Sequence, residues 1–304
     1  MALTAISPFE QNSQVSSDHP QKPELFGPGA CPKRGVRPLR FGVSVAELLV
    51  AISIVAMVAT ATAALARAMQ QAFEIMEAQG QVVQQARVCL ERIVHTVSQA
   101  RTSPQFPGFL VVTYSFDTFP IADTLVVWSP KGNAAEPEGL PRFNELVVYC
   151  PHPEHPNRLL EIRFPEDSRP VPPITDLSSW RQELQNLKQA SDAQRVELSA
   201  LMRTVTLTTG LVTKRQAGLW FFSRMRPSEE EWLQYMQGSR SWESLSWVQG
   251  MYGVHRGIRQ HWLRIELQML PPELASSSTG TREPLPFFGS VAIYYPVKRP
   301  SGGP

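Results

Sequence analysis

The sequence predicts an α+β protein in which a long N-terminal helix packs against a head of antiparallel β-strands. The first observation is a segment from Val43 to about Arg101 that contains no proline and keeps a helical spacing of apolar residues. The second is a series of short β-branched runs beyond Ser103, separated by turns that contain Pro and Gly, which is typical of antiparallel strands. We therefore expect a leader over 1–42, a long helix over 43–102 and a globular, β-rich head over 103–304.

The composition is that of a folding protein, with 42% hydrophobic and 18% charged residues in 304. The formal net charge is +2, and the segment Met1–Gly42 accounts for all of it, with five basic and three acidic residues. Because the remainder is neutral, nothing in the charge favours nucleic acid as a partner. The leader is rich in Pro and Gly, and its composition predicts disorder.

An apolar run extends from Val43 to Ala66, 24 residues with Glu47 as the single charge. As a helix it is about 36 Å long, enough to cross a bilayer. Because it has no polar face, we do not expect it to be a core helix of a soluble domain. Basic residues precede the run and only Arg67 follows it closely, so the positive-inside rule predicts a single pass with the N-terminus in the cytoplasm and the head outside.

Two ordinary interpretations of the run explain only part of it. A secretory signal peptide would use Ala64-Leu65-Ala66 as its cleavage site, although the run is long for an h-region. A plain signal anchor explains the length but leaves Glu47 without a role. A carboxylate costs about 2.5–3.5 kcal/mol at the bilayer centre, so an acid in such a run indicates function.

The segment "RFGVSVAELLVAISIVAMV" resembles the class III signal of type IV pilins and type II secretion pseudopilins. Gly42 matches the residue before the cut, Val43 the new N-terminus and Glu47 the fifth mature residue. The resemblance implies cleavage after Gly42 by a prepilin peptidase, N-methylation of Val43, and a pilin-like fold in the inner membrane with a periplasmic head. It also implies that Glu47 pairs with the N-terminal amine of a neighbouring subunit.

Elementary electrostatics supports that role for Glu47. The new α-amine of Val43 has an ordinary pKa of about 7.7–8.0 and is therefore largely protonated at neutral pH. An ammonium and a carboxylate near a membrane offset each other's desolvation when they pair. We expect Glu47 to be an assembly residue.

The expected function is that of a structural subunit, a minor pseudopilin of a type II secretion or type IV pilus machine, with neither enzymatic activity nor a cofactor. "QQARVCLERIVHTVSQAR" (84–101) resembles the end of the long helix of minor pseudopilin J, and a head of about 200 residues suits a minor subunit. The expected partners are other pilin-like subunits, the prepilin peptidase and an inner-membrane assembly platform. The alternative is a signal-anchored or secreted periplasmic binding protein or hydrolase.

The helix is expected to continue beyond the membrane as an amphipathic segment. One apolar stripe is predicted, made of Met69, Phe73, Met76, Val83, Leu90, Val94 and Val97. Thr102-Ser103-Pro104 is expected to end the helix.

The head is expected to hold eight strands and two further helices. The predicted strands are 109–115, 124–129, 145–150, 158–164, 205–212, 219–223, 262–270 and 290–295. The predicted helices are 178–203 and 229–237, the second with Ser228 as its N-cap. Leu263, Ile265, Leu267 and Met269 alternate with polar or large residues, which predicts a half-buried antiparallel strand.

Few residues beyond the apolar run suggest chemistry. Cys89 and Cys150 are either a disulfide of an exported domain or two separate buried thiols. Cys150, His152, Glu154 and His155 are zinc-type ligands within six residues, although the intervening prolines favour a solvated turn over a metal site. The Trp- and Arg-rich region over 219–262 is either core or a partner surface.

Overall fold

The computed structural model describes Gly42 and residues 44–117, 119–210, 212–247, 256–271 and 283–299. It divides into a first unit up to Ala61 and a second unit from Thr62 onwards. The long helix α1 (Val45–Ser98) begins in the first unit and ends in the second. The α+β class, the long helix and the antiparallel strands predicted from the sequence are confirmed.

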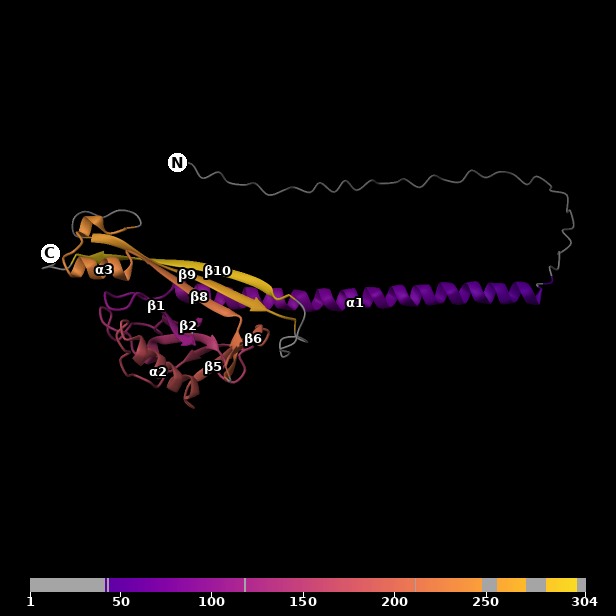
Figure 1. Ribbon diagram of the computed structural model, residues 1–304, viewed down its shortest axis with the longest axis horizontal. Coiled ribbons are helices and arrows are strands. Elements are labelled where there is room, and N and C mark those ends of the chain that lie inside the picture. Colours follow the sequence, from indigo (N-terminus) through magenta and orange to yellow (C-terminus); the bar gives the residue numbers. More distant parts are fainter. Residues whose placement is uncertain are drawn as a thin grey trace, which may run out of the picture. The chain divides into compact units, whose positions relative to one another are not determined.

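The strands that the structure describes in the head form two sheets and a separate hairpin (Figure 1). The first sheet has five antiparallel strands in chain order: β1 (Phe109–Phe116), β2 (Phe119–Trp128), β3 (Leu146–Pro151), β4 (Leu159–Arg163) and β5 (Gln194–Ser199). The second has the order β10-β9-β8: β8 (Leu219–Arg226), β9 (Arg256–Met269) and β10 (Leu285–Lys298). The hairpin pairs β6 (Thr204–Thr209) with β7 (Val212–Ala217).

Within the described residues, four short helical segments connect the strands. They are η1 (Phe143–Glu145), α2 (Leu177–Gln189), α3 (Glu229–Met236) and η2 (Trp242–Ser244). The predicted cap of α3 is confirmed, since Ser228 Oγ accepts from Glu231 N and Glu231 Oε2 accepts from Ser228 N, forming a capping box.

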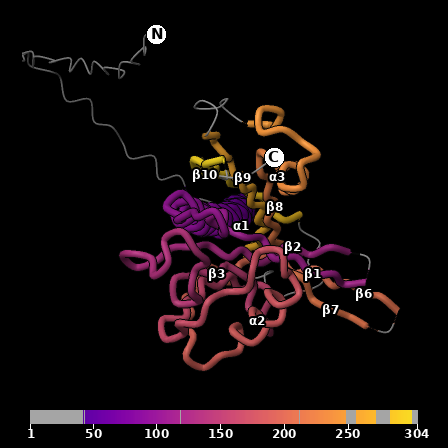
Figure 2. Tube along the Cα trace, turned by 90° about the vertical axis from the view of Figure 1, so that its left-hand side faces the viewer, coloured from indigo at the N-terminus to yellow at the C-terminus, as the bar shows by residue number. Residues whose placement is uncertain are grey.

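The last third of α1 lies in the main core, between the two sheets (Figure 2). Its buried residues are Val82, Ala86, Cys89, Ile93, Thr96 and Val97. Side chains of both sheets pack on them, among them Leu125 and Tyr149 from the five-stranded sheet and Ile265 from β9. β10 lies against α1 at Gly289, where an added Cβ would lie 3.2 Å from Leu90 Cδ2.

The opposite face of the five-stranded sheet carries a second core, which α2 covers with Trp180, Leu184 and Leu187. β3 is buried on both faces: Val147 and Tyr149 lie in the main core, while Val148 and Cys150 lie in the second core, under α2. Since side chains alternate along a strand, this explains why β3 reads as a continuous apolar run.

A polar network ties α1 to the first sheet inside the main core. The Glu161 carboxylate, with its side chain only 3% exposed, accepts from Arg92 Nε at 2.9 Å and Arg92 Nη2 at 3.1 Å, and from Arg163 Nε at 3.2 Å. Tyr149 Oη donates to it at 3.2 Å and also lies 2.8 Å from Thr96 Oγ1 on the helix. A buried charge is tolerated here because it is paired and hydrogen-bonded.

Three predictions about elements are corrected. The buried face of α1 is shifted from the predicted stripe: Met69, Phe73, Met76 and Val83 are exposed, and Leu90 and Val94 lie at the edge of the core. The predicted helix over 178–203 ends at Gln189, because Gln194–Ser199 pairs with the open edge of β4 as β5. The predicted strand over 205–212 is the β6–β7 hairpin, which turns at Gly210 with φ +58°.

The Trp-rich region is core only in part, since Trp220, Trp232, Trp247 and Trp262 are half-buried. Trp242 and Tyr235 are fully buried and pack with Leu245, Trp232 and Trp247 in a third, smaller cluster. The predicted alternation in β9 is confirmed, with Leu263, Ile265, Leu267 and Met269 all buried.

Candidate functional site: the start of α1 and a basic pocket in the head

α1 is long and apolar enough to span a membrane. Its most apolar 18-residue window has a mean hydropathy of 2.4, and no residue of that window is buried. No residue of α1 before Val82 is buried either. Apolar side chains exposed along such a length require lipid or another protein to cover them.

Glu47 and Ser44 form a capping box at the start of α1. Ser44 N donates to Glu47 Oε2 at 2.9 Å, and Glu47 N donates to Ser44 Oγ at 3.2 Å. These two bonds satisfy backbone N–H groups that a helix N-terminus leaves without partners. The sequence-based interpretation of Glu47 missed this role, although Ser-x-x-Glu before an apolar run is the signature of such a box.

The two processing residues differ in what the structure describes. Gly42 is exposed, and a Cβ added to it would meet no atom within 4 Å. A side chain at Gly42 is therefore compatible with the folded chain. Val43 lies outside the described residues.

Cys89 and Cys150 are both free and buried. Cys89 lies on α1 in the main core and donates its thiol to Leu198 O at 3.4 Å, whereas Cys150 lies in the core under α2. Burial raises the pKa of both thiols to about 11, so both are protonated at neutral pH. The structure thus has two separate buried thiols rather than a bridge.

The zinc-type residues of 150–155 do not converge. Cys150 points into the core, while His152 Nδ1 accepts from the backbone N–H of Glu154 at 3.1 Å and of His155 at 3.2 Å. The His152 ring thereby closes the turn. Among the described residues, no group of three or more His, Cys, Asp or Glu is arranged to hold a metal ion.

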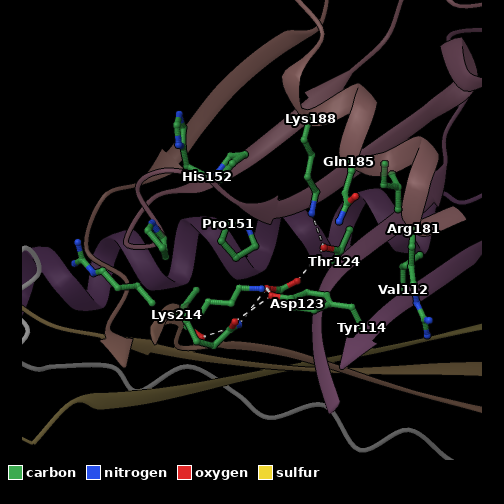
Figure 3. A pocket seen from close by; sticks show the side chains of 16 residues that line it. Val112, Tyr114, Asp123, Thr124, Pro151, His152, Arg181, Gln185, Lys188 and Lys214 are labelled. Carbon is green, nitrogen blue, oxygen red and sulfur yellow. Dashed lines mark hydrogen bonds between the residues drawn. The ribbon is translucent and has the colours of Figure 1, made fainter. Parts of the chain in front are cut away.

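A pocket of about 260 Å³ opens in the head between α2, the β1–β2 edge, the proline loop 151–156 and β7 (Figure 3). We call it the basic pocket. The four cations that line it are Arg181, Lys188, Lys214 and Arg215, against the single carboxylate of Asp123. No motif in the sequence indicated it, because its lining comes from residues 112 to 217.

Neutral groups satisfy Asp123 at the floor of the basic pocket. Its carboxylate accepts from Tyr114 Oη at 3.0 Å, Thr124 Oγ1 at 2.9 Å and Gln216 Nε2 at 3.0 Å, and Asp123 is 5% exposed (Figure 3). Burial raises the pKa of Tyr114, and the neighbouring Asp123 charge adds to this, so the phenol stays protonated and donates.

The two lysines of the basic pocket form no ion pair with any described residue. Lys188 Nζ donates to Thr124 Oγ1 at 2.9 Å, and Lys214 Nζ lies 4.0 Å from the centroid of the Tyr114 ring. Burial lowers the pKa of Lys214, and the charge of Lys188 lowers it further, against the opposing effect of Asp123. Positive charge is thus concentrated here without an equal negative charge.

No protein-family model matches the chain, and comparison with curated proteins and with solved structures finds no significant match. Its function is therefore inferred from its residues and their geometry.

Proposed function

We propose that the chain is a pilin-like structural subunit, a minor pseudopilin of a type II secretion or type IV pilus machine. In this account a prepilin peptidase cuts after Gly42, Val43 becomes the N-methylated N-terminus, and α1 holds the protein in the inner membrane. The head lies in the periplasm, and the subunit assembles through α1 with other pilin-like subunits on an inner-membrane platform.

The observation that carries the proposal is the division of α1 into an exposed apolar part and a buried part. Residues 82–97 contribute buried side chains to the main core of the head, whereas Val45–Ala66 is apolar and without a buried residue. A helix that serves as the core of one domain and exposes an apolar stretch of membrane-spanning length is what a filament subunit requires, because lipid covers that stretch before assembly and neighbouring helices cover it afterwards.

Three exposed apolar residues beyond the membrane-spanning stretch argue against a secreted, soluble product. Met69, Phe73 and Met76 are 52%, 65% and 67% exposed. Cleavage after Ala66 would leave them uncovered in water at the new N-terminus. In a bundle of subunits, the same side chains pack against neighbouring helices.

Glu47 has two roles in this account, and substitutions separate them. The capping box needs a hydrogen-bond acceptor, which glutamine also supplies, whereas pairing with the N-terminal ammonium of a neighbour needs the negative charge. Glu47→Gln therefore removes the charge and keeps the cap. Ser44→Ala removes the reciprocal cap and keeps the charge.

The test is the amount of each variant in the filament fraction, sedimented from solubilised inner membranes of the organism that encodes the protein. We expect Glu47→Gln and Glu47→Ala to be depleted about a hundredfold, since loss of one partner of a buried pair costs about 3 kcal/mol or more. Ser44→Ala is expected to assemble nearly normally, because a lost cap costs about 1 kcal/mol. Normal incorporation of Glu47→Gln together with failure of Ser44→Ala would show that Glu47 acts only as a cap.

A further inference from the structure

The basic pocket has the charge, the size and the surroundings of a site for an acidic side chain. Its two lysine ammonium groups reach the same cavity from different elements, Lys188 from α2 and Lys214 from β7 (Figure 3). The only carboxylate in the lining, Asp123, already accepts three hydrogen bonds from neutral donors and lies at the floor. An anion entering from solvent would therefore meet the lysines.

The ammonium group of Lys214 has unused hydrogen-bond donors. An ammonium group can donate three hydrogen bonds, yet Lys214 Nζ makes none to any described residue and contacts the rings of Tyr114 and Phe116 at 4.0 and 5.9 Å from their centroids. Lys188 Nζ uses one donor, on Thr124. The partial burial of both lysines strengthens the attraction for an anion relative to that of a fully solvated lysine.

The size of the cavity limits the ligand. About 260 Å³ is below the range of pockets that hold drug-sized ligands or cofactors, which begins near roughly 300 Å³. The lining also lacks what phosphate sites usually provide, a glycine-rich backbone cradle or a helix N-terminus, because α2 contributes residues 181, 184, 185 and 188 from beyond its first turn. A single carboxylate side chain fits these limits.

Exposed apolar side chains also stand on the two hairpins that contribute to the lining of the pocket, as a protein partner requires. Phe119, opposite Phe116 at the end of the β1–β2 hairpin, is 58% exposed, and Val212, two residues from Lys214 on β7, is 61% exposed. Residues two apart on a strand lie on the same face, so Val212 and Lys214 share a face of their hairpin. Apolar contacts next to a charged pocket are typical of protein interfaces.

We propose that the basic pocket binds a glutamate or aspartate side chain of a partner polypeptide, between the ammonium groups of Lys188 and Lys214, while Phe119 and Val212 contact apolar residues that flank it. This assignment does not depend on how the N-terminus is processed. It gives the head a docking site separate from α1.

The test measures how fast Lys214 of the full-length, detergent-solubilised protein is acetylated by an N-hydroxysuccinimide ester, read by peptide mass spectrometry. Lys131, which is exposed and does not line the basic pocket, serves as the internal reference. The probe is N-acetylglutamic acid α-amide, whose only charge is the side-chain carboxylate. A ligand of this size binds with a Kd of roughly 1 mM, so about 10 mM probe is expected to slow the labelling of Lys214 about tenfold and that of Lys131 not at all.

Three further probes test whether the ligand must be a side-chain carboxylate. N-acetylglutamine amide has the same shape without the charge, N-acetylalanine carries only a chain-terminal carboxylate, and inorganic phosphate is the competing anion. We expect little protection from any of them. Equal protection by the neutral amide, or stronger protection by N-acetylalanine or phosphate, would overturn the proposal, and these arms need no mutant protein.

Variants then place the site. Lys188→Met removes one ammonium and is expected to abolish protection of Lys214 by the acidic probe, whereas Lys298→Met, at an exposed lysine that does not line the basic pocket, is expected to leave protection unchanged. The intrinsic tryptophan fluorescence of each variant reports whether the head is folded. Unchanged protection in a folded Lys188→Met protein would mean that the lysines do not bind the probe together.

Discussion

The ion pair between Arg92 and Glu161 predicts an asymmetric response to substitution. Glu161 is 3% exposed, whereas the side chain of Arg92 is 52% exposed and that of Arg163 is 24% exposed. Removing Arg92 leaves a buried carboxylate with weaker compensation, but removing Glu161 leaves two arginines that water can reach. Breaking a buried pair costs about 3–5 kcal/mol when the remaining charge is uncompensated.

The magnitudes follow from the contacts that remain. In Arg92→Leu, Glu161 keeps its hydrogen bonds from Arg163 at 3.2 Å and from Tyr149 at 3.2 Å. We therefore expect the free energy of unfolding to decrease by about 2–3 kcal/mol, less than for a buried charge that has lost all its partners. In Glu161→Leu, the buried charge is gone and Tyr149 keeps its bond to Thr96 at 2.8 Å, so we expect a loss of about 1 kcal/mol or less. The double variant is expected to resemble Glu161→Leu, which means that the second substitution partly rescues the first.

The assay is denaturant unfolding of the full-length protein in detergent, followed by tryptophan fluorescence, since Trp128 and Trp180 are fully buried in the head. Arg87→Leu is the matched control, because Arg87 pairs with Glu91 on the same helix at 2.7 Å but both side chains are mostly exposed. Its unfolding midpoint should not move. A larger loss in Glu161→Leu than in Arg92→Leu, or additive losses in the double variant, would refute this reasoning.

The same network predicts a dependence on acid. Burial by itself would raise the pKa of Glu161, but the hydrogen bonds and charges of Arg92 and Arg163 outweigh burial and lower it. The stability that this carboxylate provides is therefore present above its unfolded pKa of about 4.3 and is lost as the pH falls through the lower, folded pKa. Glu161→Leu should lack this part of the acid destabilisation.

Three other predictions concern the core and the helix. Burial lowers the pKa of His261 to about 3. As the pH falls from 6.5 to 3, the free energy of unfolding should therefore decrease by up to about 1.4 kcal/mol per pH unit. His261→Phe should make this part of the pH profile flatter. At pH 8 iodoacetamide should label neither Cys89 nor Cys150 in the folded protein, because burial protects both thiols. In denaturant it should label both without a reducing agent, because no disulfide joins them. Labelling that requires a reducing agent would contradict this. Ile93→Ala should destabilise the head by about 2–5 kcal/mol. Phe73→Ala, on the exposed part of α1, should change the stability of the head by less than about 0.5 kcal/mol but reduce incorporation into filaments. Equal losses of stability in the two variants would contradict the division of α1.

Much of the fold could be predicted because periodicity reports local structure. From Leu263 to Met269, β9 alternates so regularly that the sequence predicts its buried face residue by residue. The buried face of α1 could not be predicted, because apolar residues lie on several of its faces. Burial on α1 begins only at Val82, so Val82, Ala86 and Cys89 belong to the core, while Phe73 and Met76, which precede them, remain exposed.

β5 shows why the second predicted helix was too long. Leu187, Leu198 and Leu201 happen to recur at helical steps, but the edge of β4 offers unpaired backbone groups to residues 194–199. That hydrogen bonding is a tertiary effect, and it outweighs a weak local preference for helix. Ser191 and Asp192, which lie in the turn between α2 and β5, were the available local signal.

The two candidate sites differ in how far a sequence can reveal them. The start of α1 is continuous in sequence, so Gly42, Val43 and Glu47 could be named from spacing, and the Ser44–Glu47 cap could have been. The basic pocket joins residues of β1, β2, α2 and β7 that are up to about a hundred positions apart. Only the register of the strands and the packing of α2 bring them together.

The N-terminus of the mature protein tests the central claim most directly. We would purify the protein from membranes of the organism that encodes it and identify its N-terminal peptide by mass spectrometry, with Gly42→Leu as the processing-defective control, which the space around Gly42 tolerates. The account predicts a peptide that begins at N-methylated Val43 in the wild type and an uncut leader in Gly42→Leu. A wild-type peptide that begins at Arg67, or an intact leader, would contradict it.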